Sequence, residues 1–277
     1  MIAGMVWIFW GVVGYGGAKL MYPWVEQFLW ECGSFEENYQ GRKTPVGAGL
    51  VIYLTGLILS GVQGILGPWS IFPLLPWLLF GTSTAVLAGW LDDQHGVKAI
   101  KGLRGHFRVL WRQGKWTTGL FKVLFFATAA SVIALTFSQN VWHWLLLTGL
   151  LMLSINTFNL LDVRPGRAIK AFLFTFVAVG VLSLENAWAT AWMPYIGATL
   201  AVGWLELRER CMLGDTGANL LGLLIGMWIV VQQQPWLSAV FFFLFAGLHI
   251  LAEISSISRF IERIRWLNWV DRWGRQN

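Results

Sequence analysis

Long apolar runs separated by polar connections dominate the chain. A helix needs roughly 20 mostly apolar residues to cross a bilayer. Nine runs approach that length: 2–20, 47–66, 71–91, 118–138, 141–161, 169–185, 187–205, 217–233 and 236–256. This pattern predicts an all-α, polytopic membrane helix bundle with about nine transmembrane helices. The count depends on residues 169–205, which read as two short spans with a weak break between them.

The composition favours a membrane protein over a soluble one. Hydrophobic residues make up 56% of the chain and charged residues only 12%, whereas soluble domains carry about 25% charged residues. Many of the 19 Trp residues stand at the ends of apolar runs, where an amphipathic ring suits the headgroup zone. There is no fixed-period repeat and no low-complexity linker. We therefore expect one transmembrane domain at 1–256 and a polar tail at 257–277.

The basic residues gather on one side of the predicted membrane. None of the 20 Lys and Arg residues lies in the four short connections between spans, and most lie in the longer loops and the tail. Positive charge marks the cytoplasmic face, which predicts the N-terminus outside and the C-terminus inside a bacterial-type plasma membrane. The net charge of +6 then favours anionic lipid or phosphate as partners, and no nucleic acid. Cys32 and Cys211 fall in inner loops, so we expect free thiols.

The tail has the pattern of an interfacial helix. Ile257, Phe260, Ile261, Ile264 and Leu267 fall on one helical stripe, with arginines around it and three Trp residues further on. An amphipathic helix of this kind lies in the membrane interface with its apolar face buried. We expect it on the inner face.

Four carboxylates share one position relative to the membrane, at the inner end of a span. Asp92 and Asp93 close the third span, Asp162 closes the fifth, and Asp215 opens the eighth. Clustered carboxylates repel, and a hard divalent cation relieves that repulsion. The alternative is that each acid pairs with an arginine or, for Asp215, caps a helix. Four acids on one face favour a metal site.

Four segments, in order, resemble the polyprenyl-phosphate N-acetylhexosamine-1-phosphate transferase family. Residues 41–53 look like its basic first inner loop with Lys43, and Gly89–Asp93 (GWLDD) looks like its aspartate pair. Asn156–Asp162 (NTFNLLD) matches its NxxNLxD pattern, and Gly214–Gly222 (GDTGANLLG) looks like its GDTGS segment. The resemblance covers nearly the whole chain.

The resemblance implies an enzyme of cell-envelope glycan synthesis, such as that of peptidoglycan, with residues 1–256 as its catalytic domain. A UDP-linked amino sugar would be the donor and polyprenyl phosphate the acceptor, with the active site cytoplasmic. It implies four catalytic acids, Asp92, Asp93, Asp162 and Asp215. Three of them, Asp92, Asp93 and Asp215, would hold Mg²⁺. Candidate substrate-binding residues are Lys43, Lys98, Lys101, Asn156, Asn159, Arg164 and Arg167. A homodimer and either direct or covalent transfer stay open.

The chain departs from the family pattern at the nucleotide-sugar end. After Asp162 the family has a second aspartate, and this chain has Pro165 between Arg164 and Arg167. We expect those arginines to contact anionic substrate. Gly96 stands where the family has a lysine, Met212 stands where it has an aromatic residue, and the histidine-rich last inner loop is replaced by the tail.

Two other functional classes fit the sequence less closely. A non-catalytic descendant would bind polyprenyl phosphate or a partner protein without turnover. A transporter would place ionisable residues near mid-span, and only His249 and Glu253, toward one end of the ninth span, come near that position.

Overall fold

The protein is a bundle of long helices with a small hairpin and a two-helix tail at one end. The computed structural model describes residues 2–38, 40–66, 72–95, 111–112, 114, 118–183 and 188–275. The elements in these ranges are α1 (Ile2–Glu31), β1 (Phe35–Glu37), β2 (Lys43–Pro45), α2 (Gly49–Leu66), α3 (Leu75–His95), α5 (Thr118–Phe137), α6 (Val141–Leu161), α7 (Arg167–Ser183), α8 (Ala189–Leu207), α9 (Gly214–Val230), α10 (Pro235–Ile254), α11 (Ile257–Arg263) and α12 (Arg265–Arg272).

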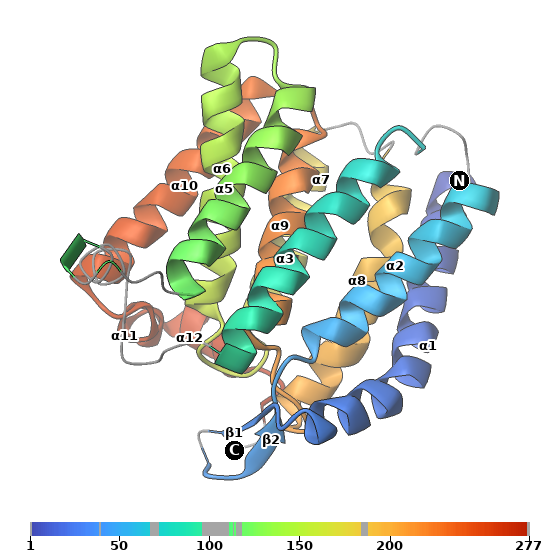
Figure 1. Ribbon diagram of the computed structural model, residues 1–277, viewed down its shortest axis with the longest axis vertical. Coiled ribbons are helices and arrows are strands. Elements are labelled where there is room, and N and C mark those ends of the chain that lie inside the picture. Colours follow the sequence, from blue (N-terminus) through green and yellow to red (C-terminus); the bar gives the residue numbers. More distant parts are fainter. Residues whose placement is uncertain are drawn as a thin grey trace.

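Helix α9 is the centre of the bundle. Every residue from Thr216 to Val230 is buried, and α2, α3, α6 and α7 pack around it (Figure 1). A helix that is apolar on every side over most of its length needs neighbours on every side. Both Asp215 and the Gly-rich segment that follows it therefore lie at one end of the central helix, within reach of the helices around it.

The outer surface of the bundle is apolar, as a bilayer requires. Large side chains such as Ile8, Phe174 and Ile250 are more than half exposed, which water would penalise and lipid tolerates. By length and composition, four of the described helices are apolar enough to cross a membrane: α2, most of α5, α6 and α10, with α9 shorter. This supports a helical, multi-pass membrane protein. The count of nine spans and the orientation stay predictions.

Two local features differ from the expected helix-and-loop pattern. Residues 21–31, which the apolar pattern predicts as part of a loop between the first two spans, continue α1. The last turns of α1 run across the base of the bundle (Figure 1). Pro23 lies inside this helix and accounts for its change of direction. The rest of that loop forms an antiparallel hairpin that pairs Phe35 with Pro45, so the fold is not purely helical.

The hairpin is joined to the segment before α9 by backbone hydrogen bonds. The Met212 N–H donates to Pro45 O at 2.8 Å, and the Gly47 N–H donates to Met212 O at 3.1 Å. Because of these bonds, the first inner loop and the start of α9 form one structural unit at the end of the bundle where the C-terminus also lies (Figure 1).

Glycines let α2 and α3 touch the start of α9. A Cβ on Gly49 would lie 2.2 Å from Gly217 Cα, and a Cβ on Gly89 would lie 2.5 Å from Asp215 O. Side chains cannot be accommodated at such distances, so these positions require the smallest residue. The close approach brings the end of α3, with its two aspartates, beside Asp215.

The tail forms two short helices instead of the single helix predicted. The chain leaves helical geometry at Ile264, where φ is −101° and ψ is 108°, so α11 and α12 point in different directions. The predicted stripe faces inward in part, since Ile257 is buried. A second stripe, made by Trp266, Trp269 and Trp273, is about two-thirds exposed. Cys32 and Cys211 are both free thiols, as predicted.

Candidate active site

Two of the predicted carboxylates meet on one lysine. The Lys122 ammonium, near the start of α5, donates to Asp92 Oδ2 at 3.1 Å and also to Asp215 Oδ2. These side chains are 14%, 26% and 28% exposed. Because the lysine carries a single charge and the two acids together carry two, the cluster is net negative. Such a cluster suits a further cation.

Asp93 has a different position from its neighbour. Its carboxylate accepts hydrogen bonds from the backbone N–H groups of Asp215 and Thr216, at 2.9 and 3.0 Å, and from the Thr216 hydroxyl at 2.5 Å. The first N–H groups of a helix have no partner within the helix, and here a carboxylate from α3 supplies it. The capping role considered for Asp215 therefore belongs to Asp93, while the Asp215 side chain points to Lys122.

The NxxNLxD segment positions Asp215 from the opposite side. Asn159 donates to Asp215 Oδ2 at 3.2 Å and to Asn219 Oδ1 at 3.4 Å, which links α6 to the first turns of α9. Asp162 follows α6 directly. Burial raises the pKa of Asp162 well above its usual value, and the nearby charges of Glu206 and Asp215 add to this effect.

Two cavities of different character adjoin this cluster. The first is apolar, has a volume of about 570 Å³ and lies between α3 and α5, lined by Leu87, Ala88, Leu91, Asp92, His95, Phe121, Lys122 and Phe125. The second is polar, has a volume of about 290 Å³, and includes Asp93, Asp162, Arg164, Glu206 and Asp215 in its lining, with Glu36, Asn38 and Thr44 from the hairpin region. Since Lys122 contacts both Asp92 and Asp215, the two cavities border on the same charged cluster.

The carboxylates of this cluster fit a magnesium ion that takes part of its ligands from the protein and part from a substrate. Within the residues that the structure describes, no group of three or more His, Cys, Asp or Glu is arranged to hold a metal by itself. Mg²⁺ typically uses one or two carboxylates, with waters and substrate phosphates as the other ligands. Asp92 and Asp215, which both contact the Lys122 ammonium, supply these two carboxylates.

The remaining predicted residues lie in several places. The Lys43 ammonium lies 5.0 Å from the centre of the Phe35 ring. Asn156 donates to His249 of α10, with 2.7 Å between Nδ2 and Nε2. Lys98 and Lys101 lie outside the described residues.

The two arginines after Asp162 differ in their contacts. Arg164 lines the polar cavity, and its predicted contact with substrate stays a prediction. Arg167 is buried, and its guanidinium contacts Asp271 and Ser258 of the tail. Of the two, Arg164 is the one placed to meet a ligand in the polar cavity.

Lys122 is a residue of the site that the sequence pattern did not predict. It lies within an apolar run, at 118–138, and was counted only as one of the basic residues. A charge inside a predicted span is costly unless it is paired or functional. That rule, applied to every span, marks Lys122 together with Lys19 and Lys170, which also lie in predicted spans, and it does not identify the partners of Lys122.

A profile of glycosyl transferase family 4 matches residues 75–233 of the chain. The chain belongs to this family. The matched segment contains all four predicted catalytic aspartates and Lys122, and it excludes both the hairpin with Lys43 and the C-terminal tail. A search of curated proteins found no match.

Membership in family 4 supports the resemblance to polyprenyl-phosphate hexosamine-1-phosphate transferases. The protein is accordingly a membrane-embedded member of a transferase family whose reaction type is sugar-phosphate transfer to polyprenyl phosphate. The apolar surface of the bundle agrees with a lipid substrate.

Proposed function

We propose that this family 4 protein transfers a sugar 1-phosphate from a UDP-linked N-acetylated amino sugar to polyprenyl phosphate, with Mg²⁺ as cofactor. The reaction would take place at the inner face of a bacterial-type plasma membrane, in cell-envelope glycan synthesis. The observation that carries this proposal is that an apolar cavity and a polar cavity border on one charged cluster, Asp92–Lys122–Asp215.

The apolar cavity suits the polyprenyl chain. Four of its lining side chains, Leu87, Leu91, Phe121 and Phe125, are about half exposed on the outer surface of the bundle, so a lipid can enter from the side. The same cavity ends in the polar groups of Asp92 and Lys122. A bound isoprenoid would therefore place its phosphate beside the Lys122 ammonium.

The polar cavity suits the nucleotide sugar. Arg164 brings a guanidinium, which binds phosphate oxygens in a bidentate manner, to a cavity whose other polar lining groups are carboxylates, the Asn38 amide and the Thr44 hydroxyl, among several apolar side chains. Because Arg164 stands in the segment that departs from the family pattern, we expect a donor preference that differs from that of the usual family member.

The proposed reaction is a direct phosphoryl transfer. An oxygen of the lipid phosphate attacks the β-phosphorus of the UDP-sugar, a P–O bond forms, and the P–O bond to UMP breaks as UMP leaves with the electron pair. The attacking phosphate is already anionic near neutral pH, so positioning and charge neutralisation matter more than a strong base. Mg²⁺ bound by Asp92 and Asp215 would neutralise phosphate oxygens.

The chain's own residues prepare the cluster for this step. Asn159 holds the Asp215 carboxylate, and Asp93 fixes the backbone at the start of α9. Lys122 lines the apolar cavity and contacts Asp215 of the polar cavity, so its positive charge would lie close to the lipid phosphate.

A labelled-donor assay tests the proposal. Purified protein receives a panel of UDP-N-acetylhexosamines carrying ³²P in the β-phosphate, together with polyprenyl phosphate and Mg²⁺. We expect the label in the lipid fraction and unlabelled UMP in the aqueous fraction. Transfer of sugar without the label would show sugar transfer instead of sugar-phosphate transfer. Binding of polyprenyl phosphate without any transfer would favour the non-catalytic alternative.

A further inference from the structure

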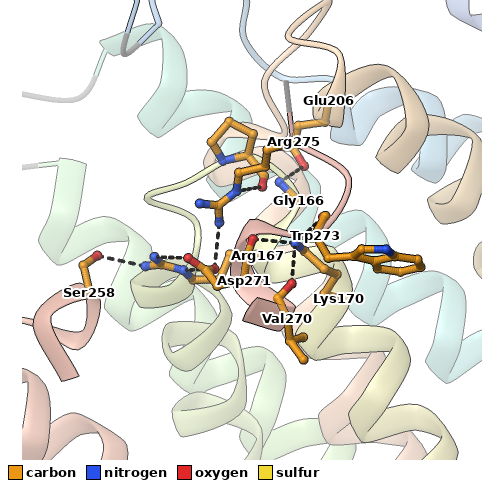
Figure 2. Close-up of polar contacts among 10 residues, drawn as sticks. Gly166, Arg167, Lys170, Glu206, Ser258, Val270, Asp271, Trp273 and Arg275 are labelled. Carbon is orange, nitrogen blue, oxygen red and sulfur yellow. Dashed lines mark hydrogen bonds and ion pairs between the residues drawn. The ribbon is translucent and has the colours of Figure 1, made fainter. Parts of the chain in front are cut away.

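The tail is fastened to the loop after Asp162 by a buried ion-pair cluster. Arg167 donates to both oxygens of Asp271, at 2.7 and 2.9 Å, and Arg275 donates to Asp271 Oδ1 at 2.7 Å (Figure 2). Arg275 also donates to Pro165 O at 3.0 Å. Burial by itself would raise the pKa of Asp271, but the two arginines outweigh burial and lower it. Asp271 is therefore a charged anchor between the tail and the loop.

Lys170 and Glu206 extend this connection in two directions. The Lys170 ammonium donates to the carbonyls of Val270, Asp271 and Trp273, at 3.0, 2.6 and 3.0 Å (Figure 2). These carbonyls lie at the C-terminal end of α12, where the helix dipole favours a positive charge. The Glu206 carboxylate accepts from the N–H groups of Gly166 and Leu213, at 3.0 and 3.1 Å. Hydrogen bonds thus connect the tail, the loop after Asp162 and the segment before α9.

A basic pocket of about 260 Å³ lies where the tail meets this loop. Its lining includes Arg164, Arg167, Arg272 and Arg275 together with Asp271 and Glu262, so four guanidinium groups face two carboxylates. Asp271 is already shared by Arg167 and Arg275. Among the described residues, Arg164 and Arg272 form no ion pair. The pocket therefore has an excess of two positive charges and suits an anion.

The surface beside the pocket points to a lipid as the source of that anion. Trp266, Trp269 and Trp273 are spaced by three and four residues, which places them on one side of the tail, and they are 66%, 68% and 67% exposed. Trp residues in this arrangement lie at the level of lipid headgroups. On the same helix, Asp271 is buried and faces the loop. The tail thus presents aromatic side chains outward, and Arg272, three residues after Trp269 on the same helix, links this aromatic stripe to the basic pocket.

We propose that this pocket binds the phosphate group of an anionic membrane phospholipid, next to the polar cavity of the proposed reaction and away from the Asp92–Lys122–Asp215 cluster. Arg164 and Arg272 contact the phosphate, and the three Trp side chains lie among neighbouring headgroups. Because Arg164 lines both this pocket and the polar cavity, a bound lipid orders the loop that leads from Asp162. The site does not depend on the proposed transferase activity.

The test measures lipid-dependent stability of the full-length protein. Thermal unfolding is followed in nanodiscs of phosphatidylcholine alone and in nanodiscs with increasing phosphatidylglycerol, and separately with inorganic phosphate. A ligand that binds only the folded state raises the unfolding temperature. We expect phosphatidylglycerol to raise it and inorganic phosphate to have little effect. A response to inorganic phosphate equal to that of the lipid would overturn the lipid assignment.

Matched variants separate this pocket from general surface charge. Arg272→Gln removes a pocket arginine, and Arg265→Gln removes an exposed arginine of the same helix that does not line the pocket. We expect Arg272→Gln to weaken the phosphatidylglycerol response about tenfold in lipid concentration, and Arg265→Gln to leave it unchanged. Equal losses in both variants would contradict the proposal. Should Arg272→Gln fail to fold, Asn268→Asp, which adds a negative charge to the pocket at constant size, must show the same loss.

Discussion

At the scale of single residues, the candidate site is a balance of charges around Lys122. Two carboxylates, one from α3 and one from α9, approach one ammonium from α5. These ion pairs join the ends of the three helices. The arrangement explains why a charged residue lies at the start of an apolar span. In the proposed function, Lys122 and the magnesium ion would compete for the same two acids.

Replacing Lys122 should therefore make the protein dependent on magnesium. In Lys122→Met the repulsion between Asp92 and Asp215 has no counter-charge, and in metal-free buffer we expect the free energy of unfolding to fall by about 1–3 kcal/mol. Added Mg²⁺ should restore more stability to this variant than it adds to the wild type. The exposed Glu253→Gln variant serves as a control for unspecific ion effects. Equal Mg²⁺ responses in wild type and Lys122→Met would contradict the shared-site reading.

At the scale of elements, the separation between α3 and α9 decides the geometry of the site. Gly89 has no space for a side chain, since a Cβ would lie 2.5 Å from Asp215 O. We expect Gly89→Ala to push the helices apart, lower stability and reduce sugar-phosphate transfer at least tenfold. Gly61→Ala on α2, where nothing lies within 4 Å of the new Cβ, should be neutral or stabilising because Ala favours helix over Gly. Full activity in Gly89→Ala would show that this contact does not set the site.

The tail is the second element whose attachment can be measured. Arg167 and Asp271 are 6% and 8% exposed at their side chains, and breaking such a buried pair costs about 3–5 kcal/mol. Arg167→Gln should lower thermal stability and speed hydrogen exchange in α12, while the exposed Arg263→Gln should do neither. From sequence we expected Arg167 to bind substrate. Reduced substrate affinity without loss of stability would return Arg167 to that role.

Element positions followed from the apolar pattern more readily than contacts did. The runs at 141–161 and 236–256 match α6 and α10 closely, because a long apolar run has few alternatives to a helix. Pattern could not show that Asp93 caps α9 or that Arg167 turns toward the tail. These outcomes depend on which side chains meet across helices far apart in sequence. The hairpin was missed because its strands have only three residues each, too short for an alternating signal.

At the scale of the whole molecule, the N-terminus lies at one end of the bundle, while the hairpin, the tail and the C-terminus lie at the other (Figure 1). The charged cluster lies toward the latter end, since Asp92 closes α3 and Asp215 opens α9. The positive-inside rule predicts that this end is cytoplasmic. With the two termini at opposite ends of the bundle, the chain would cross the membrane an odd number of times.

The two natural cysteines make this orientation testable. Cys32 is exposed and Cys211 buried, so an impermeant thiol reagent applied to intact cells should leave the wild type unlabelled and label it at Cys32 only after the membrane is opened. Gln139, exposed in the connection between α5 and α6, should be labelled from outside as Gln139→Cys in a Cys32→Ser background. Labelling of Cys32 in intact cells would place the charged cluster on the outer side of the membrane and contradict the predicted orientation.

The central claim is that Asp92 and Asp215 hold the magnesium ion for sugar-phosphate transfer. The most direct measurement is the rate at which β-³²P label passes from the UDP-sugar to polyprenyl phosphate, across a Mg²⁺ titration. The comparison covers the wild type, Asp92→Asn, Asp215→Asn and, as the control, Glu253→Gln at an exposed position on α10. We predict a loss of roughly a hundredfold or more in each aspartate variant at all Mg²⁺ concentrations, with folded protein and an unchanged control. Wild-type rates in either aspartate variant, or transfer that continues without a divalent cation, would contradict the account.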